Sequence, residues 1–135
     1  TDYIKIVNGE VTVNNIDTPT YYVNSVSGEQ TITAVDTWYH VVVTTATGIN
    51  VNDMDIGRLE GEIDFMDGLI DQVALWNTTF SINQVRSLYI QGRGFNVGTF
   101  GSGNLKGYWP FENNANDGSG NSHNGTNNGA TYTGS

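Results

Sequence analysis

Three carboxylates, Glu62, Asp64 and Asp67, lie in one short stretch of the chain. Two carboxyl groups can act as nucleophile and general acid when their pKa values differ and they lie about 5–5.5 Å apart. Residues five apart on a regular strand point to opposite faces, but a β-bulge would return Glu62 and Asp67 to one face. The stretch is therefore a weak catalytic candidate, and an ordinary polar strand and turn is the favoured alternative.

A second group of oxygen ligands lies in a glycine-rich loop near the end of the chain. Asp117, Ser119 and Asn121 occupy alternate positions, a spacing that is common in Ca²⁺ sites. The loop lacks the glycine placement and the closing glutamate of an EF-hand. The alternative is an Asx-type turn, in which Asp117 and Asn121 bond to the nearby backbone.

The remaining candidates are isolated side chains. His40 lies in an apolar strand and His123 in the Asn/Gly loop, and neither has a Ser or Cys partner in a nucleophile motif. We expect the tryptophans to pack in the core, because they lie within strongly patterned strands. Tyr21, Tyr22 and Tyr132 are freer, and they are the candidates for stacking on a sugar ring.

Composition excludes several classes of protein. A net charge of −9 leaves no basic surface for a phosphate backbone, so the sequence predicts no nucleic-acid partner. No apolar run approaches the ~20 residues that cross a bilayer, and the absence of Cys excludes disulfides and thiolate metal sites. Charged residues are only 14%, so Thr, Asn, Ser and Gly must cover the surface, a composition that favours all-β structure.

The clearest local structure is a hairpin at the start of the chain. Asn8-Gly9 supplies the two positive-φ residues of a type I′ turn. The two-residue loop predicts that Val7 pairs with Glu10, and that Ile4 and Ile6 pair with residues 13 and 11 on one apolar face.

Further short strands are expected throughout the chain, and one segment is helical. Apolar residues on both faces of 38–45 and 68–76 predict central strands. Ser81 and Gln84 form a capping box, and Gly92 stops a helix near 81–91. The other predicted strands span residues 20–23, 31–35, 49–51, 56–59, 105–111 and 130–133.

This organisation divides the chain into three parts. Residues 1–92 form a β-sandwich body that includes the helix, and 93–104 form a Gly-rich linker. Residues 105–135 supply a strand and an Asn/Gly loop that either complete the sandwich or start a following module. Because the chain begins at Thr1 and lacks a signal-like stretch, we expect it to be a segment of a longer protein.

Several blocks resemble the laminin-G-like, concanavalin A-like jelly-roll family. Trp38–Thr44 looks like its W-x-H strand, and Asp67–Asn77, continuing through 80–89, is similar to its G-x-I-D block. Leu105–Phe111 and Asp117–Thr126 look like its Y-W-x-F strand and D-x-S-G-N loop. The resemblance implies an antiparallel β-sandwich. In the family the last two blocks come first, so the fold is either circularly permuted or split between two modules.

The resemblance also bears on the candidate sites. It places the 117–121 loop near the Ile-Asp strand, so that Asp71 or Asp67 could add a carboxylate to a Ca²⁺ site. Residues 62–67 resemble the E-I-D-x-M-E signature of retaining β-glucanases, which share the jelly roll. That resemblance implies Glu62 as nucleophile, Asp64 as its modulator and Asp67 as acid/base, although Asp67 is one methylene shorter than the glutamate found there.

The leading functional interpretation is a non-catalytic binding or structural module on an extracellular or virion surface. Modules with this sequence motif resemble those of bacteriophage tail, fibre and head-decoration proteins and of bacterial surface proteins. The implied partners are other structural subunits, in homo- or hetero-oligomers, and glycans. The alternatives are a Ca²⁺-dependent lectin module and, less favoured, a glycoside hydrolase.

Overall fold

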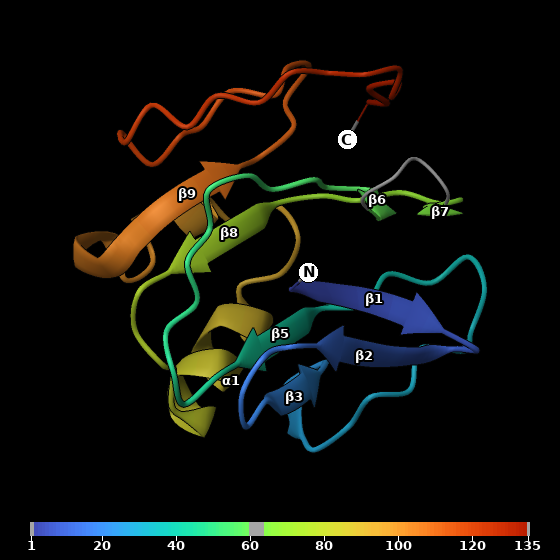
Figure 1. Ribbon diagram of the computed structural model, residues 1–135, viewed down its shortest axis with the longest axis vertical. Helices are drawn as coiled ribbons and strands as arrows, with labels where there is room; N and C mark the ends of the chain where they lie inside the picture. The colour runs from blue at the N-terminus through green and yellow to red at the C-terminus, as the bar shows by residue number, and fades with distance from the viewer. Residues whose placement is uncertain (1, 60–63, 135) are drawn as a thin grey trace. The chain divides into compact units, whose positions relative to one another are not determined.

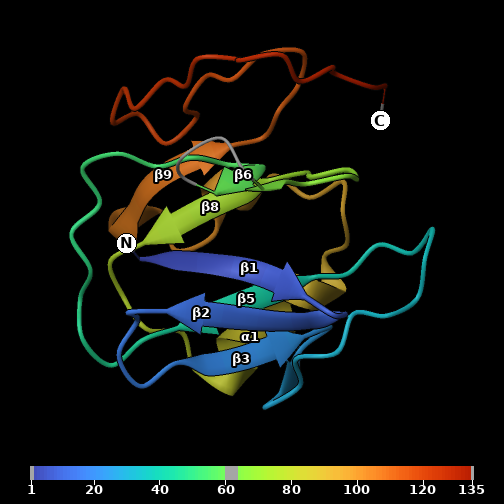
Figure 2. The same ribbon diagram turned by 45° about the vertical axis from the view of Figure 1, so that its right-hand side comes forward.

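The computed structural model describes residues 2–59 and 64–134. Within these residues the chain is mostly β with one short α-helix, and its strands form four small antiparallel sheets (Figures 1 and 2). The chain divides into two compact units. Unit 1 comprises Thr1–Gly68 and Thr79–Ile90, and unit 2 comprises Leu69–Thr78 and Gln91–Ser135.

Unit 1 opens with the predicted hairpin of β1 (Tyr3–Val7) and β2 (Glu10–Asn14). Asn8 and Gly9 both have positive φ, as a type I′ turn requires, and every predicted pair is present, from Val7 with Glu10 outward. Register and turn are therefore confirmed. Burial along the apolar face of the hairpin is uneven. Val11 in β2 is buried, whereas the two isoleucines of β1 are about half exposed.

The next sheet has the order β4–β3–β5, with β3 in the centre. β3 is Thr20–Val23, β4 is Val26–Ser27 and β5 is Val41–Thr44. Asn24 and Ser25 have positive φ and form a second two-residue turn, which was missed because the pair lacks glycine. β6 (Arg58–Leu59) and β7 (Asp64–Phe65) pair as a short separate ladder.

The helix α1 (Ile82–Ile90) confirms the capping prediction. The Ser81 N–H donates to Gln84 Oε1 at 2.8 Å, and the Gln84 N–H donates to Ser81 Oγ at 3.3 Å. Phe80 before the cap and Val85 in the helix are both buried, as a hydrophobic staple requires. Gly92 follows with φ +76°, a conformation that ends helices. The helix lies beside β5 (Figures 1 and 2), where the rings of His40 and Tyr89 approach to 5.7 Å.

Unit 2 is built on β8 (Val73–Trp76) paired antiparallel with β9 (Leu105–Trp109). Two 3₁₀ turns, Val97–Thr99 and Ser102–Asn104, precede β9. The expected linker at 93–104 is thus a folded part of this unit, and the Trp76 indole N–H donates to the carbonyl of Phe100 within it.

Several strand predictions were too long or wrong. Residues 49–51 and 130–133 form no strand, and 31–35 contributes only a bridge between Thr31 and Glu10. β5 and β8 lie at the edges of their sheets among the described residues, so their prediction as central strands was wrong. Their residues are only partly buried, and Val41 in β5 is exposed, so an apolar pattern on both faces did not mean cover on both sides.

Candidate binding sites

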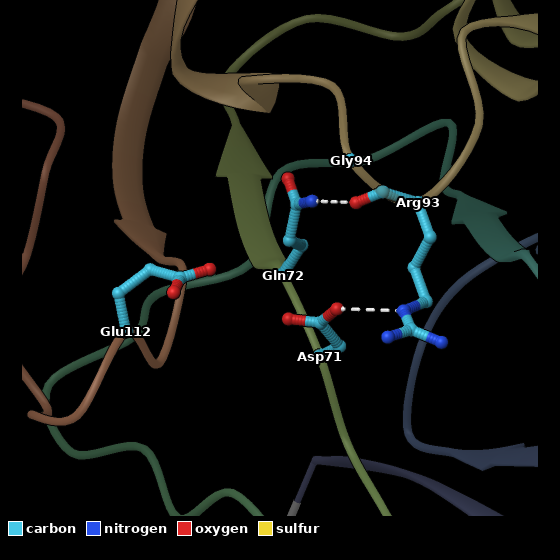
Figure 3. A pocket seen from close by; sticks show the side chains of 5 residues that line it. All are labelled: Asp71, Gln72, Arg93, Gly94 and Glu112. Atoms are coloured by element: carbon cyan, nitrogen blue, oxygen red, sulfur yellow. Dashed lines mark hydrogen bonds and ion pairs between the residues drawn. The ribbon is translucent and has the colours of Figure 1, made fainter. Parts of the chain in front are cut away.

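A cavity of about 380 Å³ lies in unit 2, at the start of β8. Figure 3 shows its lining side chains, which come from three separate segments of the chain. Asp71 and Gln72 precede β8, Arg93 and Gly94 follow the helix, and Glu112 follows β9. Because β8 and β9 are paired, residues at these strand ends converge on one place.

The charges in the cavity are partly matched. The Arg93 guanidinium Nε lies 3.2 Å from Asp71 Oδ2, and the side chain of Arg93 remains 45% exposed. Glu112 lies on the other side of Asp71 from Arg93 (Figure 3). The cavity therefore presents two carboxylates and one guanidinium to the same space.

The side chain of Gln72 connects two segments around this cavity by hydrogen bonds. Its side-chain amide donates to the Arg93 carbonyl, and its Oε1 accepts from the Tyr108 hydroxyl at 3.1 Å. The backbone of Gln72 has φ +51°, a left-handed conformation that is unfavourable for a residue with a side chain. Burial raises the pKa of the Tyr108 phenol, which therefore stays protonated and donates to Gln72 at neutral pH.

A tight turn holds Glu112. The Asn113 N–H donates to the carbonyl of Phe111 at 2.9 Å, which places Glu112 at the centre of a three-residue turn. Phe111 and Asn113 on either side have φ values of +57° and +63°. The backbone around the cavity thus departs from favourable conformations in two separate segments.

A second cavity, of about 410 Å³, adjoins the first and shares Gln72, Gly94 and Glu112 with it. Its other lining residues are Phe95, Asn96, Tyr108, Pro110 and Gly118. The ring of Phe95 is half-buried in this unit. The combined site therefore has a polar end and an end with aromatic carbon.

The predicted Ca²⁺ loop makes a dense hydrogen-bond network around Asp117. Oδ1 of Asp117 accepts the backbone N–H groups of Tyr108 (2.9 Å) and Ser119 (2.8 Å). Oδ2 accepts the Ser119 hydroxyl (2.8 Å) and the backbone N–H of His123 (3.0 Å). The side chain is fully buried. Burial raises its pKa, but these hydrogen bonds outweigh burial and the pKa is lowered overall.

The same loop covers the outer edge of β9. The Gly118 N–H donates to the Tyr108 carbonyl at 2.7 Å, beside the Tyr108 N–H that donates to the Asp117 carboxylate. Asn121 Nδ2 donates to the carbonyls of Leu105 and Lys106 at 3.0 and 3.2 Å. The predicted Asx-type arrangement is present in this loop, with Asp117 and Asn121 bonded to backbone groups.

The other predicted metal ligand and the predicted catalytic group lie elsewhere. Asp71 is bonded to Arg93 in the cavity, and that cavity's lining does not include Asp117. Glu62 lies outside the described residues, while Asp64 in β7 and Asp67 after it are exposed. The residues at 2–59 and 64–134 contain no group of three His, Asp or Glu side chains placed to hold a metal.

Of the three tyrosines predicted to contact sugars, Tyr22 is only 7% exposed and belongs to the core, so its ring offers no face to a ligand. β3 is the central strand of its sheet, and alternate residues on such a strand are covered. Tyr21 and Tyr132 are each partly exposed. His40 has a buried Nδ1 atom without a hydrogen-bond partner in the described part of the chain.

Sequence reasoning missed Gln72, Arg93 and Glu112 as possible site residues. One signal was available for Arg93, because it is one of only five Lys and Arg residues and lies between Gly92 and Gly94. A cation flanked by glycines is presented on a loop. No sequence signal placed Glu112 next to it, because that depends on the pairing of β8 with β9.

Unit 1 contains an open strand edge on β1. Val11, opposite Ile6, directs its peptide groups away from β1: its N–H donates to the Gln30 carbonyl at 2.8 Å, and its carbonyl accepts from the Gln30 side chain. Antiparallel geometry then directs the peptide groups of Ile4 and Ile6 away from β2. Those groups have no strand partner among the residues that the structure describes.

Comparisons with protein-family models, with curated proteins and with solved structures found no match to this chain. Within the described ranges, no helix has both the length and the apolar character needed to cross a membrane.

Proposed function

We propose that this chain is a non-catalytic structural module of an extracellular or virion surface, which assembles with further copies of itself by strand addition at β1. The observation that carries the proposal is the open edge of β1, with Ile4 54% and Ile6 49% exposed. An unpaired strand edge is a template for another strand, and long exposed apolar edges are rare in chains that remain alone.

The outer edges of β1 and β9 differ in whether another part of the chain covers them. Side chains and backbone of the Asp117 loop bond to the outer edge of β9, so that edge is closed within its own unit. β1 has no such cover in the described structure and has neither proline nor a bulge to discourage pairing. Strand addition is therefore expected at β1 and not at β9.

A second copy fits this edge in an antiparallel, two-fold register. Placing Ile4 opposite Ile4 of the second copy forms a hydrogen-bonded pair, because both residues direct their peptide groups outward. The same register sets Lys5 opposite Tyr3 of the second copy and so avoids a direct contact between two lysines. Lys5 already lies over the Tyr3 ring within one chain, at 5.3 Å, so this pairing repeats a contact that the chain makes itself.

For the finer architecture we propose a concanavalin A-like jelly roll in circularly permuted form. The pairing of β8 with β9 supports this version, because a module split between two copies would leave β9 to pair with another chain. The resemblance of the sequence blocks to bacteriophage and bacterial surface proteins supports the placement on a virion or cell surface.

Cysteine substitution tests the assembly, because the natural chain has no cysteine. Hydrogen-bonded antiparallel partners have Cα atoms about 5.5 Å apart, within the range that a disulfide spans. Ile4→Cys should therefore form a disulfide dimer under mild oxidation at micromolar concentration. Ile6→Cys is the matched control, since its expected partner is Asp2 of the second copy.

A further variant separates pairing from chance collisions. Ile6→Pro removes an outward N–H group and no β1–β2 hydrogen bond, so the hairpin should persist while dimerisation is lost. Sedimentation equilibrium measures the dimer in each variant. A chain that remains monomeric at high micromolar concentration, with equal cross-linking of both cysteine variants, would refute the proposal.

A further inference from the structure

We propose that the cavity lined by Asp71, Gln72, Arg93, Gly94 and Glu112 binds a neutral saccharide. This site lies in unit 2 and is independent of the β1 edge, so it adds a binding activity to the proposed structural role.

The charges of the cavity select the class of ligand. The Arg93 guanidinium offsets one of the two carboxylates and so weakens the attraction for a cation, while an anion would be repelled by Asp71 and Glu112 and by the net charge of −9. A neutral ligand rich in hydroxyl groups is subject to neither effect. Hydroxyls donate to carboxylates and accept from a guanidinium, so such a ligand uses both kinds of group in the cavity.

The groups are also held in place before any ligand arrives. Arg93 is oriented by its ion pair with Asp71, and its backbone carbonyl is held by the Gln72 side chain. Glu112 is held by the turn between Phe111 and Asn113. Preorganised polar groups lose little conformational freedom on binding, which lowers the entropic cost of binding a small polar ligand.

The backbone around this cavity is strained. Gln72 and Phe111 adopt positive φ, a conformation that costs about 1 kcal/mol or more for such side chains, whereas Asn113 tolerates it. Strained conformations concentrate at ligand sites, where they direct side chains that a relaxed backbone would direct elsewhere. Here the strain sets the directions of Gln72 and Glu112, two of the five lining residues.

Size and surface agree with a sugar ring. The cavity of about 380 Å³ and its neighbour of about 410 Å³ lie within the range of small-molecule sites. The neighbouring cavity adds the half-buried ring of Phe95 and part of Tyr108. The apolar C–H face of a pyranose packs on aromatic carbon while its hydroxyls reach the carboxylates. A disaccharide would span both cavities.

Two-dimensional ¹H–¹⁵N NMR of the full chain tests the proposal. The probes are glucose, galactose, mannose, N-acetylglucosamine and their β-linked disaccharides, with glucuronic acid and glucosamine as charged counterparts. We expect saturable shifts in the millimolar range for at least one neutral sugar, with the largest changes at the amides of residues 71, 93, 94 and 112.

Two variants assign the binding to the cavity. Glu112→Ala removes a carboxylate whose side chain makes no hydrogen bond among the described residues, so the fold should be retained while affinity falls about tenfold. Arg93→Ala should weaken binding similarly, and the exposed helix residue in Arg86→Ala is the matched control.

Three outcomes would overturn the proposal. The first is no shift with any neutral sugar at 50–100 mM, which is roughly the weakest binding that a shallow site shows. The others are binding of a charged counterpart only, and shifts that map to Tyr21 or Tyr132 instead. The Ile4→Cys dimer is measured without sugar, so either result leaves the test of assembly unaffected.

Discussion

Substitution of Asp117 tests whether one buried carboxylate organises the second unit. Its two oxygens accept three backbone N–H groups, from Tyr108, Ser119 and His123, together with the Ser119 hydroxyl. No part of its side chain is exposed. Asp117→Ala removes all four acceptor contacts at once and leaves three backbone donors facing a small void.

The expected loss follows from these contacts. A hydrogen bond to a charged group contributes roughly 1.5–3 kcal/mol, and a buried donor left without an acceptor costs roughly 1–3 kcal/mol. Water can reach the exposed outer residues of the loop and will satisfy some of the donors. We therefore take about 1 kcal/mol for each backbone donor, which gives ~3 kcal/mol of lost unfolding free energy for Asp117→Ala. Asp117→Asn, which keeps one acceptor oxygen, should lose about half of this.

Urea unfolding monitored by tryptophan fluorescence measures the change. Trp76 and Trp109 both belong to unit 2, so a Trp38→Phe background restricts the signal to that unit. Glu112→Ala is the matched control, because it deletes a carboxylate of the same unit that makes no side-chain hydrogen bond to any described residue. A loss below about 0.5 kcal/mol for Asp117→Ala would refute the reasoning, since that is the level expected of an ordinary surface substitution.

The pH dependence of the same variant gives an independent check. The folded-state pKa of Asp117 is lowered from its ordinary value of 3.8. A group with a lowered folded pKa contributes stability above its unfolded pKa and loses it as pH falls through the folded value. The wild-type chain should therefore lose this contribution below about pH 4, and Asp117→Ala should lack that part of the acid transition.

Three further predictions concern packing, protonation and capping. Gly107→Ala should cost ~2 kcal/mol in urea unfolding, because the new Cβ would lie 2.8 Å from Trp109 Cζ3; Gly103→Ala, in open space, is the control. Burial lowers the pKa of His40, so the folded chain should lose stability as pH falls below about 6.5 (the ordinary value), and thermal melts of His40→Phe should lose that dependence. Ser81→Ala should lower the unfolding free energy by ~1 kcal/mol, followed by circular dichroism at 222 nm, since it removes half of the capping box.

Local structure could be predicted from the sequence where the signal lies in adjacent residues. The hairpin register followed from Asn8-Gly9, and the helix start followed from Ser81 and Gln84. In both cases turn chemistry or capping chemistry acts within a few residues, so the prediction does not depend on knowing distant contacts.

Strand lengths and sheet order could not be predicted in the same way. β8 is limited to Val73–Trp76, although its apolar pattern extends further back toward residue 68. Left-handed Gln72 breaks the extended conformation immediately before β8, and nothing in its residue type indicates a positive φ. The same conformation helps to form the cavity, so the feature that limited the strand prediction also concealed the candidate site.

The Asp117 loop shows how one motif supports different interpretations until its surroundings are known. Alternate Asp, Ser and Asn residues suit a cation, but the same oxygens also suit backbone N–H groups. Here the acceptor capacity of Asp117 is taken up by four hydrogen bonds, and the loop as a whole pairs with the edge of β9. A loop that replaces a neighbouring strand protects an edge without lengthening the sheet. The edge of β1 lacks such a cover among the described residues, and this contrast is the reason that strand addition is proposed at β1 and not at β9.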